Sequence, residues 1–195
     1  MIAAVLAGGK ARRFGGEKLL YKVSGKPLIL HTIGRVLRAE KIEEVVIVTS
    51  RGKQEIFEKL GFRVITDELE VGPAGGVYAA LHKLGDAFVI AGDMPLVQPE
   101  FVDYIVEKFH KLKPHVCVPK WENGYLEPLH AAYSKSFLEI LEKQIAKGRY
   151  MLNEAIRLSK PCYIKIETLP EAWRESFFNV NTKSDLKKIK GFSRV

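Results

Sequence analysis

Apolar and polar positions follow two alternating patterns along the first half of the chain. Short apolar runs that end at Gly, Asp or Ser predict buried strands at residues 2–7, 44–50, 62–66 and 87–91. Between them, apolar residues recur at helical spacing and predict helices at residues 27–37, 54–60 and 73–84. Because strands and helices alternate and the strands are apolar on both faces, this order indicates an α/β fold: a mostly parallel sheet with helices on both faces.

The pattern continues beyond residue 98 and then becomes looser. It predicts a helix at 99–112, strands at 115–120 and 124–133, helices at 134–146 and 149–158, and a strand at 162–166. A short apolar run at 177–180 comes next, and Thr182 and Asp185 have the spacing of a capping box that opens a lysine-rich last helix. Since no linker, repeat or low-complexity tract interrupts this series, we expect residues 1–195 to form a single domain.

Length and composition exclude several classes of protein. A chain of 195 residues can build a core without disulfide or metal staples. The longest stretch without a formal charge, from Val71 to His82, is too short to cross a bilayer, and the first residues lack a secretion signal, so a cytoplasmic protein without a membrane span is expected. Cys117 and Cys162 lie in apolar, strand-like runs and are expected to act as small buried hydrophobes. The five histidines lack the spacing of a zinc site.

The formal net charge of +8 allows three kinds of partner: nucleic acid, an anionic membrane surface or a phosphorylated substrate. The charge is concentrated in two segments. Lys10–Lys26 contains six basic residues and one acidic residue, and Lys183–Arg194 contains five and one. Basic residues interleaved with aromatic residues, which a nucleic-acid surface requires, do not occur. The distribution therefore favours small phosphorylated ligands.

The first strand leads into an unusual glycine loop, which from Leu6 to Lys18 has the sequence LAGGKARRFGGEK. Glycine has no Cβ to hold a backbone N–H away from a phosphate, and nearby Lys and Arg side chains add positive charge, so the loop could form an anion cradle. The alternative is a solvated basic surface loop. The loop matches neither the Walker A pattern nor G-x-G-x-x-G.

Two segments carry candidate ligands for a magnesium ion. Asp93 directly follows a buried strand and precedes Met94 and Pro95, so its carboxylate is available at the edge of the sheet where ligands usually bind. Far downstream, Asn179 and Asn181 precede the last helix, and an Asn carbonyl is a weaker ligand for Mg²⁺. For each residue the alternative is a turn-forming role.

A third segment combines a carboxylate with glycines at the start of a helix. Asp67 ends the third predicted strand, and Gly72, Gly75 and Gly76 surround the start of the helix that follows. The amides and the dipole of such a helix start favour negative charge. Close packing of the helix against a strand would explain the glycines equally well.

Together these motifs resemble a known family. LAGG, RFGGEK and D-x-P are similar to motifs of the nucleotidyltransferases that activate phosphorylated acceptors. GPAGG at 72–76, EPLHAAY at 127–133 and FFNVNTKSDL at 177–186 resemble the molybdenum cofactor guanylyltransferase family in particular. The resemblance spans nearly the whole chain. It implies a Rossmann-like, nucleotide-diphospho-sugar-transferase-like fold, and transfer of GMP from GTP to the terminal phosphate of molybdopterin or molybdenum-molybdopterin, with Mg²⁺ as cofactor and release of pyrophosphate.

The resemblance also implies roles for individual residues. The backbone would hold the guanine nucleotide at Leu6, Ala7, Gly8 and Gly9. Asp67 would help to hold the nucleoside, and Asp93 would bind Mg²⁺, assisted by Asn181 with Asn179 as second choice. Lys18 would meet the phosphates, and Lys18 and Arg13 would offset the charge that grows during transfer. A general base is not expected, because a phosphate monoester is already ionised near neutral pH.

The sequence departs from the family pattern at two places. Ser50 stands where the family commonly has Asn before Arg, which shortens one expected contact to the base. Ala74 makes the GPLAG-like segment smaller. Three alternatives remain open: transfer from CTP or another nucleoside triphosphate, a sugar-phosphate acceptor, and a nucleotide-binding regulatory module without chemistry. Proteins of molybdoenzyme maturation are expected partners.

Overall fold

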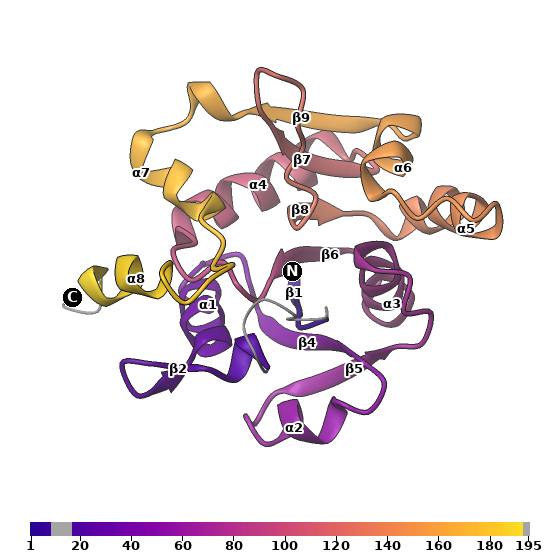
Figure 1. Ribbon diagram of the computed structural model, residues 1–195. Helices are drawn as coiled ribbons and strands as arrows, with labels where there is room; N and C mark the ends of the chain where they lie inside the picture. Colours follow the sequence, from indigo (N-terminus) through magenta and orange to yellow (C-terminus); the bar gives the residue numbers. More distant parts are fainter. Residues whose placement is uncertain (9–16, 193–195) are drawn as a thin grey trace.

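The computed structural model describes residues 1–8 and 17–192 (Figure 1). Its centre is a seven-stranded sheet with the order β5-β4-β1-β6-β8-β7-β9. The strands are β1 (Ile2–Leu6), β4 (Glu44–Ser50), β5 (Arg63–Asp67), β6 (Ala87–Ala91), β7 (Val116–Lys120), β8 (His130–Tyr133) and β9 (Pro161–Lys165). Every neighbouring pair is parallel except the two pairs that β8 makes with β6 and β7. The mostly parallel sheet predicted from the alternating pattern is therefore confirmed.

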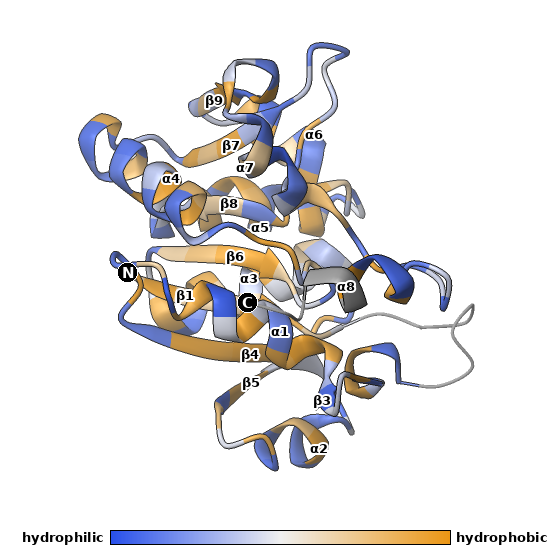
Figure 2. Ribbon diagram, turned by 90° about the vertical axis from the view of Figure 1, so that its left-hand side faces the viewer, coloured by the Kyte–Doolittle hydropathy of each residue, from blue (hydrophilic) through white to orange (hydrophobic). Residues whose placement is uncertain are grey.

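Helices bury both faces of the sheet. Because side chains alternate along each strand, every strand contributes residues to both faces. In β1, Ala3 and Val5 join one core cluster, whereas Ala4 and Leu6 join the other. The first cluster includes buried residues of α1 (Leu28–Val36) and α4 (Pro99–Leu112), and the second those of α3 (Pro73–Leu84), α5 (Leu138–Ala146) and α6 (Leu152–Leu158). Figure 1 shows α1 and α4 on one side of the strands and α3, α5 and α6 on the other, and Figure 2 shows that β1, β4 and β6 are largely apolar. Each large apolar side chain that is fully buried contributes about 1.5–3 kcal/mol relative to exposure.

Shorter elements complete the chain. A two-stranded hairpin, β2 (Lys22–Val23) and β3 (Lys26–Pro27), precedes α1, and α2 (Gln54–Glu58) covers β5. After β9 the chain forms α7 (Glu171–Arg174) and α8 (Leu186–Phe192). Single 3₁₀ turns occur at Lys18–Leu20, Lys135–Phe137, Ile166–Thr168 and Glu175–Phe177. Neither the hairpin nor the turns between residues 166 and 177 has a periodicity long enough to predict.

Two expectations for the second half of the chain are wrong in part. The strand expected at 124–133 is limited to His130–Tyr133, because a turn at Gly124 and the residue Pro128 interrupt the pairing, and Leu126 makes only an isolated bridge to Lys120. The helix expected at 149–158 begins at Leu152. The last helix occurs, but it begins at Leu186, after the Thr182–Asp185 motif that was expected to open it. Asp185 accepts hydrogen bonds from the backbone N–H groups of Asn181 and Thr182 ahead of it, and these bonds lower the pKa of Asp185.

The order of the strands determines where a ligand can bind. The chain adds β4 and β5 on one side of β1 and then places β6 on the other side, so the direction of winding reverses between β1 and β6. At such a reversal the loops that follow the two strands separate and leave space at the carboxyl edge of the sheet. Gly8 follows β1 and Asp93 follows β6, so two predicted site residues lie at this edge.

The two cysteines are free thiols on neighbouring strands. Cys117 of β7 and Cys162 of β9 are register partners, and both contact the first core cluster, Cys117 fully buried and Cys162 half-buried. Their expected role as small hydrophobes is confirmed for Cys117. Among the described residues, no helix combines the length and hydropathy needed to cross a bilayer.

Candidate functional site

A cavity of about 710 Å³ lies at the carboxyl edge of the sheet. It is formed by the loops that follow β1, β4, β5 and β6, the first turn of α3, and two segments from elsewhere in the chain. The lining residues are Leu6, Gly8, Glu17, Lys18, Leu19, Val48, Thr49, Ser50, Arg51, Lys53, Asp67, Glu70, Gly72, Pro73, Gly76, Ala91, Gly92, Asp93, Leu129 and Asn179. The fold thus brings together residues that are far apart in the sequence.

Lys18 and Asp93 line this cavity, and both form hydrogen bonds with the buried Val180. The Lys18 ammonium lies 2.5 Å from Oδ2 of Asp93 and donates a second hydrogen bond, 2.8 Å long, to the carbonyl of Val180. The backbone N–H of Val180 in turn donates to the carbonyl of Asp93 at 3.0 Å. Both charged side chains are about one-sixth exposed (17%), so each remains accessible from the cavity. A cation therefore already neutralises the carboxylate that was predicted to bind metal.

Asp67 lies at the start of α3, where glycines allow it to approach closely. Its Oδ1 accepts hydrogen bonds from the backbone N–H groups of Leu69 (3.0 Å) and Glu70 (3.1 Å), which shape the loop before the helix. A Cβ on Gly75 would lie only 2.6 Å from both carboxylate oxygens, and a Cβ on Gly76 would lie 3.1 Å from the side chain of Leu6. Close packing, one of the two roles considered for these glycines, is therefore present, and Asp67 itself lines the cavity.

Some backbone N–H and carbonyl groups at the end of β1 already form hydrogen bonds with neighbouring strands and loops. Leu6 accepts a hydrogen bond from the N–H of Gly92, while Ala7 donates to Val48 and accepts from the Thr49 hydroxyl. Leu6 and Gly8 line the cavity, whereas the buried Ala7 is not among the lining residues. Two other predicted site residues, Gly9 and Arg13, lie outside the described residues.

The rim of the cavity contains charged residues that the sequence did not single out. Lys53, after β4, pairs with Glu17 at 2.5 Å. The neighbouring Arg51 pairs with Glu68, and its backbone N–H donates to Glu70. Their position after a parallel strand was the signal that could have identified them, because every such loop reaches the same edge. Ser50 also lines the cavity, as its position at the end of β4 predicts.

The two asparagines of the FFNVNT segment have different surroundings. Asn179 lines the cavity, and its side-chain amide donates to the carbonyl of Phe177 at 3.0 Å, so its side-chain oxygen is left for other partners. Asn181 is exposed, is not among the lining residues, and is held through its backbone N–H by Asp185. The structure therefore brings Asn179, the second choice, into the cavity with Asp93.

Around β8, the next strand of the sheet after β6, the packing is largely aromatic. His130 packs among Phe88, Phe101 and Phe177, and neither of its ring nitrogens has a hydrogen-bond partner among the described residues. Burial lowers the pKa of His130 to about 3, so the ring is neutral at ordinary pH. Nearby, the indole N–H of Trp121 donates to Oε1 of Glu127 at 2.7 Å. Burial raises the pKa of Glu127, partly opposed by this hydrogen bond.

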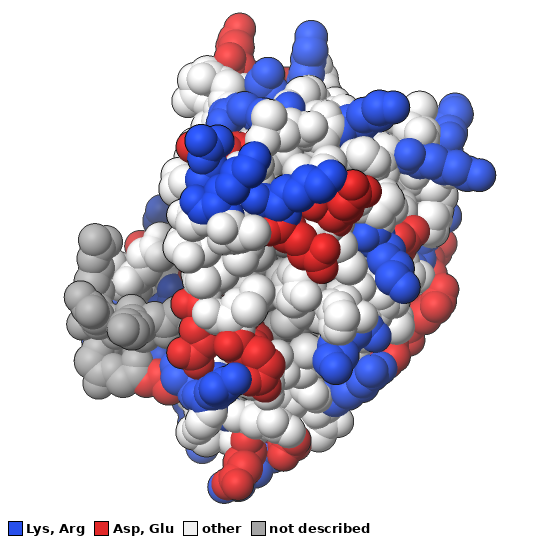
Figure 3. Space-filling view, turned by 90° about the vertical axis from the view of Figure 1, so that its right-hand side faces the viewer, with Lys and Arg blue, Asp and Glu red and all other residues white. Residues whose placement is uncertain are grey.

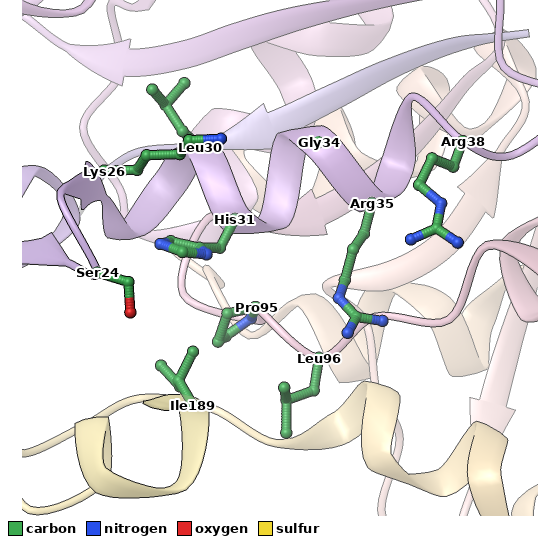
Figure 4. A pocket seen from close by; sticks show the side chains of 10 residues that line it. All are labelled: Ser24, Lys26, Leu30, His31, Gly34, Arg35, Arg38, Pro95, Leu96 and Ile189. Atoms are coloured by element: carbon green, nitrogen blue, oxygen red, sulfur yellow. The ribbon is translucent and has the colours of Figure 1, made fainter. Parts of the chain in front are cut away.

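A second cavity, of about 370 Å³, lies between α1, the loop after β6 and α8, and none of the predicted site residues that the structure describes lines it (Figure 4). Its lining residues are Ser24, Lys26, Leu30, His31, Gly34, Arg35, Arg38, Pro95, Leu96 and Ile189. Arg35 donates to the carbonyl of Val97 at 3.4 Å, and burial together with the neighbouring Arg38 lowers the pKa of Arg35. Of the described basic residues between Lys10 and Lys26, Lys18 therefore faces the first cavity, whereas Lys26 lines the second.

Surface charge gives further evidence about the kind of ligand. Figure 3 shows one face of the molecule, on which Lys and Arg alternate with Asp and Glu in small groups. Where basic side chains adjoin one another in the upper part of this face, acidic side chains border them, so the face as a whole is mixed in charge. A mixed surface does not by itself indicate a nucleic-acid backbone as the ligand.

The sequence matches the model of one protein family. Residues 3–160 match the MobA-like NTP transferase domain. A protein from Thermococcus sibiricus named probable molybdenum cofactor guanylyltransferase is 68% identical over 195 residues, which is all of both chains. A protein of the same name from Thermococcus gammatolerans is 62% identical, covering 97% of this chain and 98% of the relative.

Solved structures agree with the sequence relatives. Molybdopterin-guanine dinucleotide biosynthesis protein A from Archaeoglobus fulgidus superposes with a TM-score of 0.87 at 31% identity, covering 99% of this chain and 98% of that one. A 4-diphosphocytidyl-2C-methyl-D-erythritol synthase from Anaerococcus prevotii gives a TM-score of 0.72 at 13% identity, covering 100% and 98% of the two chains, which shows a shared fold.

Proposed function

The chain belongs to the MobA-like NTP transferase family, and from this premise we propose that it is a molybdenum cofactor guanylyltransferase, which transfers GMP from GTP to the terminal phosphate of molybdopterin. The terminal phosphate attacks the α-phosphorus of GTP, the new P–O–P bond forms, and pyrophosphate leaves. The observation that carries the proposal is the convergence of Lys18, Asp93 and Asn179 on the cavity beside the end of β1.

The donor groups in the cavity fit a magnesium ion. Mg²⁺ usually takes one or two protein carboxylates, and substrate phosphates and water complete its shell. Asp93 offers a partly exposed carboxylate, and Asn179 has a side-chain oxygen in the same cavity. We therefore assign these two residues to the ion. Asn181, given first from the family resemblance, is left outside the cavity. When bound, Mg²⁺ would supply positive charge to the phosphates of GTP.

The other residues orient the substrates and offset charge. GTP enters with its phosphates beside Gly8 and Lys18, and its nucleoside extends past Ser50 toward Asp67. Lys18 exchanges Asp93 for a phosphate oxygen and offsets the negative charge that grows on the leaving oxygens, as would Arg13. The Val180 carbonyl keeps a second hydrogen bond to Lys18 and so holds the ammonium in place during this exchange. Since the attacking phosphate is already ionised, no side chain needs to remove a proton.

The direct test follows pyrophosphate release from the purified chain with molybdopterin and each nucleoside triphosphate in turn, with and without Mg²⁺. We expect release with GTP that requires both molybdopterin and Mg²⁺. Release with CTP and not with GTP would assign a different nucleotide, which the smaller Ser50 side chain makes worth testing. Release with a sugar phosphate and not with molybdopterin would refute the acceptor. GTP binding without release under any condition would leave a regulatory binding module.

Two further proposals concern the compartment in which the enzyme acts and the proteins that receive its product. We expect the enzyme to act in the cytoplasm and to pass its product to proteins that mature molybdoenzymes, since the product is useful only after insertion into an apoenzyme. Fractionation of the native cells and recovery of the dinucleotide product in complex with an apo-molybdoenzyme would test both.

A further inference from the structure

The order of strands along the carboxyl edge indicates where the acceptor extends. β1, β4 and β5 lie on one side of β6, and their loops form most of the nucleotide cavity. On the other side lie β8 and then β7. Since β8 is antiparallel to both β6 and β7, the start of β8 and the end of β7 reach the same edge as Asp93. An acceptor with its phosphate beside Asp93 would therefore extend over β8 and β7.

The residues at this part of the edge are Glu127 and Trp121. Glu127 belongs to the run that leads into β8, and Leu129 of the same run lines the nucleotide cavity and accepts a hydrogen bond from the N–H of Ala91. Trp121 directly follows β7. With strands about 4.8 Å apart, the end of β7 lies about 10 Å from that of β6. A small phosphorylated molecule can span this distance.

The carboxylate of Glu127 is only partly paired. Oε1 accepts the indole N–H of Trp121, whereas Oε2 has no partner among the described residues and is not buried. No lysine or arginine of the described chain forms an ion pair with it. Donors to both oxygens best offset the desolvation of a half-buried carboxylate. Trp121 supplies one donor to Oε1, and a ligand with N–H groups could supply donors to Oε2.

Trp121 provides an aromatic surface next to this carboxylate. Its ring lies 5.5 Å from that of Phe177, in an edge-on arrangement, and it is partly exposed. Phe177 is two residues before Asn179, which lines the nucleotide cavity. The indole, the carboxylate and the cavity are thus connected through one packed segment. A flat heterocycle placed here could stack on an aromatic ring and donate hydrogen bonds to a carboxylate at the same time.

We propose that Glu127 and Trp121 bind the pterin ring of the acceptor, with the carboxylate of Glu127 accepting hydrogen bonds from the ring N3–H and the 2-amino group. This inference rests on the proposed function for the identity of the acceptor. The two N–H donors of a pterin lie side by side on one edge and match the two oxygens of a carboxylate. Oε1 keeps a free lone pair beside its bond to Trp121, and both lone pairs of Oε2 are available.

Guanine carries the same pair of donors, N1–H and its 2-amino group, so the test must separate the two bases. The chain has two tryptophans, Trp121 and Trp173. Trp173→Phe leaves Trp121 as the single fluorescent indole, and quenching of its emission by free 6-hydroxymethylpterin reports binding next to it. We expect Glu127→Gln in this background to weaken pterin binding by about 10–100-fold, because the amide N–H₂ opposes one donor and the charge is lost. The dissociation constant for GTP should not change.

Glu122→Gln is the matched control, because Glu122 is an exposed neighbour with the same charge, and it should bind pterin like the parent. Trp121→Phe, followed by the anisotropy of the pterin's own fluorescence, should weaken binding without changing the fold. Unchanged pterin binding in both Glu127→Gln and Trp121→Phe would refute the inference. So would loss of GTP affinity with pterin affinity retained. In the full reaction we expect Glu127→Gln to raise the KM for molybdopterin at an unchanged KM for GTP, whereas failure of the parent chain to transfer GMP would refute the proposed function instead.

Discussion

The two halves of the sheet on either side of β6 are built in different ways; we call β5, β4 and β1 the nucleotide half, after the proposed function, and β8, β7 and β9 the aromatic half. On the side of β1, β4 and β5, backbone groups and a few charged side chains form the cavity, and glycines permit the close approaches, as at Gly75 and Gly76. On the side of β8 and β7, buried rings form the structure, with His130 packed among phenylalanines. Asp93 follows β6, the strand between the two halves. A phosphate needs many N–H donors, whereas a flat heterocycle needs a surface and a matched edge.

Substitutions at the boundary between the halves should have the largest effect. Asp93→Asn and Lys18→Ala should each lower the turnover of GMP transfer about 10²–10³-fold, because each removes one charge that stabilises the transition state. Both chains should remain folded, since both side chains are partly exposed and neither belongs to a core cluster.

Single-turnover rates and circular dichroism would test this prediction. GTP and free pterin should still bind to the two variants, each in its own half. Near-normal turnover in both would show that the reacting centre lies elsewhere.

A second substitution tests the backbone of the nucleotide half. Gly75→Ala places a methyl group 2.6 Å from the Asp67 carboxylate, so Asp67 must move and lose its bonds to Leu69 and Glu70. We expect a loss of about 1–3 kcal/mol in the free energy of unfolding, as for other overpacked sites. GTP affinity should fall with it. Urea unfolding and calorimetric titration measure the two effects, and a fully stable variant would contradict the close approach described here.

A pH titration tests the aromatic half. Burial holds the pKa of His130 at about 3 in the folded chain, below its ordinary value of 6.5. As the pH falls below 6.5, the unfolded chain binds a proton there and the folded chain does not, so stability is lost between pH 6.5 and about 3. From pH 7.5 to 5.5 this amounts to about 1.4 kcal/mol. The difference between the parent and His130→Leu, followed by urea unfolding at each pH, isolates this contribution. An identical pH dependence in the two chains would exclude it.

The smallest expected effect comes from a glycine outside both halves. Gly34 lies within α1, and a Cβ built on it would meet nothing within 4 Å (Figure 4). Gly34→Ala should therefore stabilise the chain by about 0.5–1 kcal/mol, because glycine is a poor helix former. It serves as the control for Gly75→Ala, since the same change should have opposite signs at the two positions. A lower free energy of unfolding for Gly34→Ala would contradict the open space described around this position.

How much could be predicted from the sequence differs between the two halves for physical reasons. The nucleotide half consists of parallel strands, whose continuous apolar runs give clear boundaries. The candidate site residues follow strand ends, so the position of Asp67 and Asp93 at one edge of the sheet could be predicted. Lys53 and Arg51 were missed because a charged residue in a loop looks like any other until the strand order is known. The choice between Asn179 and Asn181 depended on the path of an irregular segment, which no periodicity describes.

The aromatic half depends on contacts between residues far apart in the sequence. The predicted extent of β8 was wrong. The length of an antiparallel strand inserted among parallel ones depends on pairing with its neighbours, β6 and β7, more than on its own sequence pattern. Trp121 and Glu127 are six residues apart and meet through a turn at Gly124. EPLHAAY was noticed only through a family resemblance, which identified the segment and could not say what its glutamate contacts.

The hydrogen bond between Lys18 and the carbonyl of Val180 joins residues 162 positions apart. During synthesis on a ribosome, the glycine loop, Asp67 and Asp93 all emerge long before Val180 does. Lys18 therefore gains its second hydrogen bond only when the segment after β9 has been made and has folded back against Asp93. The order of synthesis thus delays the complete arrangement of Lys18, Asp93 and Val180 until almost the whole chain has been made.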